Sequence, residues 1–307
     1  MRVNLINMKY KSNTLTTLGV TALLASASIS YAQSALTPLE VTFGGNTKYD
    51  GWYNLSSSLK EDVEVHGALY DFPGNSGYGS FPGYGAWPQA IGSQLNSNPG
   101  SAAALSKLAN GSGGGAYPSG GSMYFGGFSG DQNVDGGTLG VLESSPVLDV
   151  QTIIFQIEIG EAFAYDYFVD GLGVEQVPSL TISYGVGEEV TLNADISTLI
   201  DSLLTDTIEM PTGEGGTMEE VDIYTNLYGY QWDVSGYSDI VDFSVSFTAV
   251  QHAQLYSLQL DQSDIAYGTT SMIPSAVPEP AAMALLFGVA SSSIVVLRRR
   301  RVEKTEI

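Results

Sequence analysis

Apolar and polar residues alternate through much of the second half of the chain. The clearest stretch is 241–248, where Val and Phe residues take turns with Asp, Ser and Thr. The same period recurs in 152–159, 179–184 and 221–234. A period of two predicts β-strands with one apolar and one polar face, as in antiparallel sheets. The polar positions Glu158 and Asp242 are therefore expected to face solvent.

The pattern also suggests how some of these strands are placed. Residues 254–260 form a further predicted strand, which we expect to pair with 241–248 across a turn near Gln251 and His252. Weaker alternation occurs within residues 38–70, where the candidate inward residues are Leu39, Val41, Phe43, Val63 and Val65.

Two stretches have helical rather than period-two spacing. Apolar residues within 196–204 recur at helical intervals behind Asp195, the candidate helix cap. Residues 101–108 form the second candidate, with Ser101 as cap and Gly111 beyond the end. Many strands, one or two short helices and glycine-rich turns predict an all-β protein, an antiparallel β-sandwich of jelly-roll type.

The N-terminus reads as a secretory signal peptide. A basic start is followed by the apolar run 15–27, and Ser30-Tyr31-Ala32 supplies the small residues that a signal peptidase requires. We expect cleavage after Ala32, which assigns residues 1–32 to the signal peptide. Met8 would serve as initiator equally well as Met1.

The C-terminus combines three features in order. Val277-Pro278-Glu279-Pro280 is followed by the uncharged stretch 281–297 and then by Arg298, Arg299, Arg300 and Arg301. A helix over 281–297 would be roughly 26 Å long, at the short limit for crossing a bilayer. The arginines place their end in the cytoplasm by the positive-inside rule, so residues 302–307 form a cytoplasmic end.

This tail resembles the PEP-CTERM sorting signal of Gram-negative bacteria. The resemblance covers residues 277–301 and implies an exosortase as partner, which reads Pro278, Glu279 and Pro280 and processes the protein. It also implies a route: export, retention in the inner membrane by 281–297, and then delivery to the cell surface or extracellular matrix. The extension Val302–Ile307 is longer than the abrupt end usual in this family.

Between these ends lies a very acidic body. We assign residues 33–264 to the exported domain and 265–276 to a polar stalk. Three lysines (Lys48, Lys60 and Lys107) against 30 acids give this part a charge near −27. Such a body repels nucleic acid and anionic lipid, and it favours cations. The chain has no cysteine and therefore no disulfide.

Residues 72–130 form a distinct region, rich in glycine and aromatic residues, in which Lys107 is the only charged residue. Rings on glycine-rich loops could stack on sugars of an extracellular polysaccharide, or could simply pin the loops to the domain. The candidates for sugar stacking are Tyr78, Tyr84, Trp87, Tyr117 and Tyr124.

The sequence Asp131-Gln132-Asn133-Val134-Asp135-Gly136 matches the start of a calcium loop. Asp131, Asn133 and Asp135 are thus candidate calcium ligands. The bidentate acid should stand at position 142, which is Leu142, while Glu143 comes one place late. An ordinary Asp/Asn/Gly turn is the competing interpretation.

Motifs for catalysis are scarce. The chain has only His66 and His252, neither with a metal-ligand partner at zinc spacing, and it lacks a nucleophile elbow and a phosphate loop. We therefore expect an exported structural or adhesive protein and not an enzyme. The alternatives are a carbohydrate-binding module, with or without calcium, and a polysaccharide hydrolase with two facing carboxylates.

Overall fold

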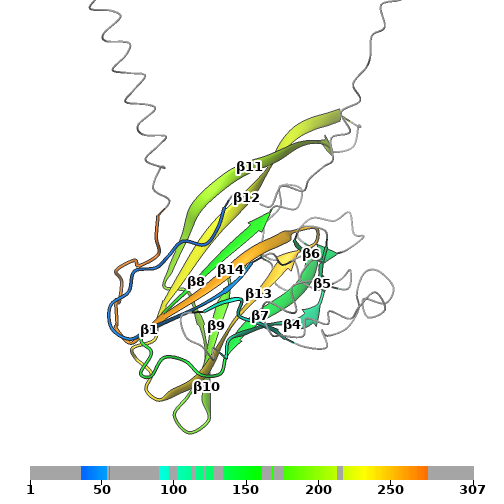
Figure 1. Cartoon of the computed structure of the whole chain (residues 1–307). Coiled ribbons are helices and arrows are strands. Elements are labelled where there is room, and N and C mark those ends of the chain that lie inside the picture. Colours follow the sequence, from blue (N-terminus) through cyan, green and yellow to red (C-terminus); the bar gives the residue numbers. More distant parts are fainter. Residues whose placement is uncertain are drawn as a thin grey trace, which may run out of the picture. The chain divides into compact units, whose positions relative to one another are not determined.

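The computed structural model describes residues 36–53, 55, 90–96, 102–111, 115–119, 122–126, 134–160, 168, 176–212 and 217–275 (Figure 1). The chain divides into two compact units, Met1–Tyr31 and Ala32–Ile307, and every described residue belongs to the second. The expected signal peptide, the strand around Val63 and Val65, and the sorting tail all lie outside the described residues.

The described part of the chain contains β-strands and no helix, and the strands form two antiparallel sheets. The large sheet has the order β11 (Ile196–Thr212), β12 (Thr217–Asp233), β8 (Thr152–Gly160), β14 (Gln254–Ser263), β1 (Thr47–Trp52) and β3 (Leu95–Asn96). In the same sheet, β6 (Met123–Gly126) pairs with β14 and with β5 (Gly115–Pro118). The small sheet has the order β10 (Glu188–Asn193), β9 (Ser179–Tyr184), β13 (Ile240–Val250), β7 (Asp135–Glu143), β4 (Ala104–Asn110) and β2 (Ile91–Gly92).

Side chains of both sheets share one hydrophobic core. The ring of Phe155 on β8 lies 5.9 Å from that of Phe247 on β13, centroid to centroid. Trp52 and Trp232 from the large sheet are buried in the same cluster as Leu180 from the small sheet. The expected all-β antiparallel fold is confirmed, and two sheets that share a core are consistent with a β-sandwich.

Both predicted helices are wrong. Residues 196–204 belong to β11, and 104–108 belong to β4. The register of β11 against β12 shifts at Leu199/Asp201 and at Leu204/Asp206, and that of β4 against β7 shifts at Lys107/Ala109. Each irregularity adds one residue to a strand and interrupts the period of two. The apolar residues of these strands therefore fell at intervals that resemble a helix.

The predicted pairing of 254–260 with 241–248 is also wrong. The turn at Gln251–Ala253 exists, and His252 adopts a positive φ of 73° there. However, this turn carries the chain from β13 in the small sheet to β14 in the large sheet, where β14 pairs with β1 and β8. Period-two alternation identifies a strand, but it does not identify the neighbour.

Two local expectations need smaller corrections. Leu39, Val41 and Phe43 lie in a segment without strand structure. Val241 is exposed, because the register of β13 against β9 shifts between Ile240 and Asp242. From Phe243 on, the predicted inward and outward positions of β13 are confirmed.

The large sheet has an edge strand that resists further pairing. β12 pairs with β8 from Thr225 to Asp233, so among the described residues the outer halves of β11 and β12 pair only with each other (Figure 1). Glu209 stands directly opposite Glu220 on this ribbon. Like charges, bulges and a proline are features that discourage edge-to-edge association, and β11 carries all three, with Pro211 near its end.

Close packing at Gly136 on β7 generates a stability prediction. A Cβ on Gly136 would lie 2.7 Å from the carbonyl oxygen of Val250 and 2.8 Å from the amide nitrogen of Gln251. Because these are backbone atoms, Gly136→Ala should lower the free energy of unfolding by on the order of 2 kcal/mol. Gly236→Ala is the matched control, since a Cβ there meets nothing within 4 Å. Urea denaturation of both variants measures the difference, and equal stabilities would contradict the packing described.

Candidate functional site

A row of polar side chains lies on the outer face of the large sheet, the face that points away from the core. Glu158 on β8 stands opposite Ser257 on β14, and Gln156 stands opposite Gln259. The sequence predicts that this row faces solvent, but Glu158 is only 2% exposed and Gln156 is fully buried. The expectation for Glu158 is thus wrong: alternation indicates which face a residue occupies, but not whether that face is covered.

The N-terminal segment, residues 36–46, crosses this outer face and is held there by Gln156. The Gln156 side chain accepts a hydrogen bond from the Leu39 amide at Oε1 (2.9 Å) and donates from Nε2 to the Leu39 carbonyl (2.7 Å). Gln259 Nε2 also donates to the Leu39 carbonyl, over 3.2 Å. The glutamine amide thus makes the two hydrogen bonds that a neighbouring strand would make.

The C-terminal segment, residues 265–275, is held in the same way by Gln231 on β12. Gln231 Nε2 donates to the Thr270 carbonyl over 2.9 Å, and the Met272 amide donates to Gln231 Oε1 over 2.7 Å. A Cβ on Gly229 would lie 2.4 Å from Cγ2 of Ile273, so glycine is needed for this approach. The residues that the sequence assigns to a polar stalk therefore contact the sheet at least as far as Ile273.

The two segments are also bound to each other. The Asn46 amide donates to Asp264 Oδ1 over 2.8 Å, and the Gly44 amide donates to the Tyr267 hydroxyl over 2.7 Å. The rings of Phe43 and Tyr267 stack with centroids 5.5 Å apart. The blue and dark orange ribbons beside β1 in Figure 1 follow this contact. Both ends of the described domain are thus fixed at one place.

Asp261 on β14 is the most strongly perturbed acid of the outer face. It is 4% exposed, and burial raises the pKa of its carboxyl to about 7. Hydrogen bonds from Gln259 and Gln156 oppose this rise, whereas the charges of Asp50 and Glu40 add to it. A carboxyl of this kind exchanges its proton near neutral pH beside the N-terminal segment.

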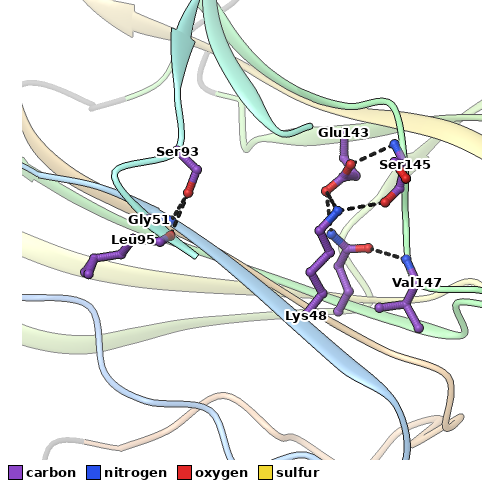
Figure 2. Close-up of polar contacts among 8 residues, drawn as sticks. Lys48, Gly51, Ser93, Leu95, Glu143, Ser145 and Val147 are labelled. Atoms are coloured by element: carbon purple, nitrogen blue, oxygen red, sulfur yellow. Dashed lines mark hydrogen bonds and ion pairs between the residues drawn. The ribbon is translucent and has the colours of Figure 1, made fainter. Parts of the chain in front are cut away.

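A second group of buried polar residues lies on the core side, and we refer to it as the Lys48 cluster. Lys48 Nζ lies 2.9 Å from Glu143 Oε2 and donates to the Ser145 carbonyl over 2.7 Å (Figure 2). Gln262 Nε2 donates to Glu143 Oε2 over 3.0 Å, and the Val147 amide donates to Gln262 Oε1 over 3.0 Å. Glu143 is fully buried, and Lys48 is 8% exposed. The cluster therefore connects β1 and β14 to the end of β7.

Of the predicted sugar-stacking residues, the structure describes Tyr117 and Tyr124. Their rings meet edge to face, with centroids 5.6 Å apart and an interplanar angle of 75°. Tyr117 is 8% exposed, and the Tyr124 hydroxyl bonds to Nδ1 of His252. Burial raises the pKa of both phenols. These two rings pack on each other and do not form a flat exposed row, while Tyr78, Tyr84 and Trp87 lie outside the described residues.

Of the predicted calcium ligands, only Asp135 is described. Its Oδ1 accepts a hydrogen bond from the Gly137 amide over 2.7 Å, and burial raises the pKa of its carboxyl. Asp131 and Asn133 lie outside the described part. Among the residues that are described, no group of three or more His, Asp or Glu side chains could hold a metal ion.

The remaining predicted site residues belong to targeting. Ala32, Pro278–Pro280 and the four arginines all fall outside the described ranges. Within those ranges there is no helix long and apolar enough to cross a membrane, and the proposed span 281–297 is not among them.

The sequence did not single out the residues that organise either buried group. Gln156, Gln231 and Asp261 occupy ordinary polar positions of alternating strands. The sequence offers one indication of the Lys48 cluster: Lys48 is one of only three lysines between the signal peptide and the sorting tail. A lysine retained in so acidic a body is a reasonable candidate for a buried partner of an acid.

Removing the Gln156 amide should release the N-terminal segment. Gln156→Leu keeps the size of the side chain but leaves the Leu39 amide and carbonyl without these bonds. We expect faster amide hydrogen exchange across residues 36–46 and a loss of about 2 kcal/mol in the free energy of unfolding. Gln176→Leu, at an exposed position, is the control. Unchanged exchange in Gln156→Leu would show that other contacts hold the segment.

Asp261 gives a pH dependence with a defined sign. Its pKa in the folded protein, about 7, is higher than the ordinary value of 3.8, so the folded state binds the proton more tightly than the unfolded state. This acid therefore lowers stability as pH rises from about 4 to about 7, by at most about 4 kcal/mol. Asp261→Asn removes that decline. Unfolding free energies measured from pH 4 to pH 8 should diverge between variant and wild type, and parallel curves would contradict the assignment.

Comparison of the chain with protein-family models, with curated proteins and with solved structures found no match.

Proposed function

We propose that this chain is an exported structural or adhesive protein of the cell surface, delivered through a C-terminal PEP-CTERM signal. The observation that carries the proposal is the order of three parts in the tail. Pro278-Glu279-Pro280 comes first, then the uncharged stretch 281–297, then Arg298–Arg301. Processing by an exosortase would separate the exported domain from the membrane segment.

The ends of the described domain fit this arrangement. The C-terminal segment contacts the large sheet as far as Ile273, and Val277 follows only four residues later. A folded body that continues almost to the motif leaves little chain between domain and signal. At the other end, the signal peptide would be removed after Ala32, shortly before Leu39 reaches Gln156.

Strand pairing supports a jelly roll as the finer description of the fold. Nested antiparallel pairs join β1 with β14, β7 with β13 and β8 with β12, and β9 pairs with β10 innermost. The members of successive pairs alternate between the two sheets. A double-wound hairpin of this kind is the jelly-roll arrangement, which is common in binding and surface domains.

Three of the buried acids in the described domain have polar partners that suit packing. Glu143 pairs with Lys48, Glu158 accepts from Ser257 over 2.6 Å, and Asp261 accepts from Gln259 over 2.9 Å. The exposed acids, together with the irregular edge of β11, favour a body that stays apart from copies of itself. These features favour a structural or adhesive role over hydrolysis.

Replacement of Glu279 tests the sorting proposal. Glu279→Ala should leave the protein in the inner membrane with its arginines attached, because the motif that the exosortase reads is lost. Glu303→Ala removes an acid beyond the arginines and is the matched control, with sorting unchanged. The measurement is mass spectrometry of the C-terminus of protein recovered from inner membrane, outer envelope and medium.

Two outcomes would count against the proposal. Wild-type protein from the envelope that still carries Arg298–Ile307 would identify the tail as a permanent anchor. Normal release of Glu279→Ala would show that the Pro-Glu-Pro motif is not read.

A further inference from the structure

In the Lys48 cluster, an amine and a carboxamide both contact one carboxylate. Lys48 on β1 stands opposite Gln262 on β14 in the antiparallel register, so both side chains leave the same face of the large sheet. Glu143, the last residue of β7, reaches them from the small sheet. Gln262 and Glu143 are fully buried, and Lys48 nearly so.

One carboxylate oxygen serves both nitrogens. Glu143 Oε2 lies 2.9 Å from Lys48 Nζ and 3.0 Å from Gln262 Nε2. The other oxygen of Glu143 accepts from the Ser145 amide over 2.7 Å, which fixes the carboxylate (Figure 2). A carboxylate placed between two nitrogens can accept a proton from one and deliver it to the other.

The carboxamide itself is polarised. Its oxygen, Gln262 Oε1, accepts a hydrogen bond from the Val147 amide over 3.0 Å. A backbone N–H directed at a carbonyl oxygen stabilises the negative charge that develops there when a nucleophile adds to the carbon. The cluster therefore contains a nucleophile, a proton carrier and an activated acyl group.

We infer that Lys48 and Gln262 become joined by an intramolecular amide bond, with Glu143 as the proton carrier. Glu143 takes a proton from the Lys48 ammonium group, and Nζ adds to Cδ of Gln262. The bond from Cδ to Nε2 then breaks, and the departing nitrogen receives its proton through Glu143. One ammonium group and one carboxamide give one secondary amide and one ammonium ion, so atoms and charge balance without an oxidant or cofactor.

The position of the bond gives it a structural purpose. It would join the first long strand of the described domain to the last, and would close the chain between residues 48 and 262. The chain has no cysteine, so a disulfide is not available for this task. A pull on the C-terminal end of the exported domain would then reach the joined strands β1 and β14 directly, and the strands between them would carry little of that force.

Peptide mapping of the full chain purified from cells tests the inference. After denaturation and digestion with trypsin together with a protease that cleaves at acidic residues, we expect no cleavage after Lys48 and one branched peptide that contains both Lys48 and Gln262. The second protease is needed because the chain has no lysine or arginine between Lys107 and Arg298. Its mass should be lower than the sum of its parts by about 17 Da, one ammonia. Intact mass alone is not sufficient, because an N-terminal Gln33 released by signal peptidase also loses ammonia on cyclisation. Fragment spectra across both residues make the distinction.

Variants assign the roles. Lys48→Arg keeps the positive charge and Glu143→Gln keeps the size, and both should yield only linear peptides. Gln262→Glu should still form the bond, now with loss of about 18 Da, one water. Lys107→Arg replaces another buried lysine and is the matched control, with the branched peptide retained.

Linear peptides alone from folded wild-type protein would overturn the inference and identify the cluster as a non-covalent ion pair. A branched peptide between Lys48 and Glu143 would overturn the role of Gln262. Both results come from wild-type protein, so they decide the matter even where a variant fails to fold.

Discussion

The antiparallel pairing of β1 with β14 is the interaction on which the other features of this domain depend. It joins the first and last long strands of the described chain and sets the register that places Lys48 opposite Gln262. The same pairing brings residues 43–46 beside residues 263–267, where the two ends exchange hydrogen bonds. Without this pairing, the N-terminal and C-terminal segments would not start from fixed positions beside the sheet. Lys48 and Gln262 would also no longer lie opposite each other in the Lys48 cluster.

Burial of polar residues gives this pairing its specificity. On the outer face, glutamine side chains hold extended backbone in place, and on the core side an acid is matched to a lysine. A buried amide or carboxylate is costly unless its partners are present, whereas apolar contacts tolerate small shifts. A slip of one residue between β1 and β14 would move the Lys48 side chain to the outer face of the sheet and would place Tyr49 on the core face instead. The polar groups therefore select one register more sharply than the apolar core does.

Local signals in the sequence were sufficient for the regular strands, but not for the bulged strands or for the pairing of strands with one another. Strands β8, β9 and β13 could be predicted because each keeps a period of two over most of its length. Strands β4 and β11 could not, since their register shifts break that period and mimic helical spacing. The covering of Gln156 was equally hidden, because it depends on a segment far away in the chain. Leu39 and Gln156 are 117 residues apart.

The sorting tail could be recognised from the sequence and the Lys48 cluster could not, because the first is a local signal and the second depends on distant segments. A sorting signal is read as a linear segment by another protein, so its chemistry is complete in consecutive residues and can be recognised there. The Lys48 cluster is assembled from β1, the end of β7 and β14, and no stretch of sequence contains more than a part of it. For a protein proposed to be released from a membrane and to work outside the cell, the sorting signal and the Lys48 cluster have complementary roles. The linear signal would determine where the domain goes, and the connection between its first and last strands would determine whether it remains folded when its end is pulled.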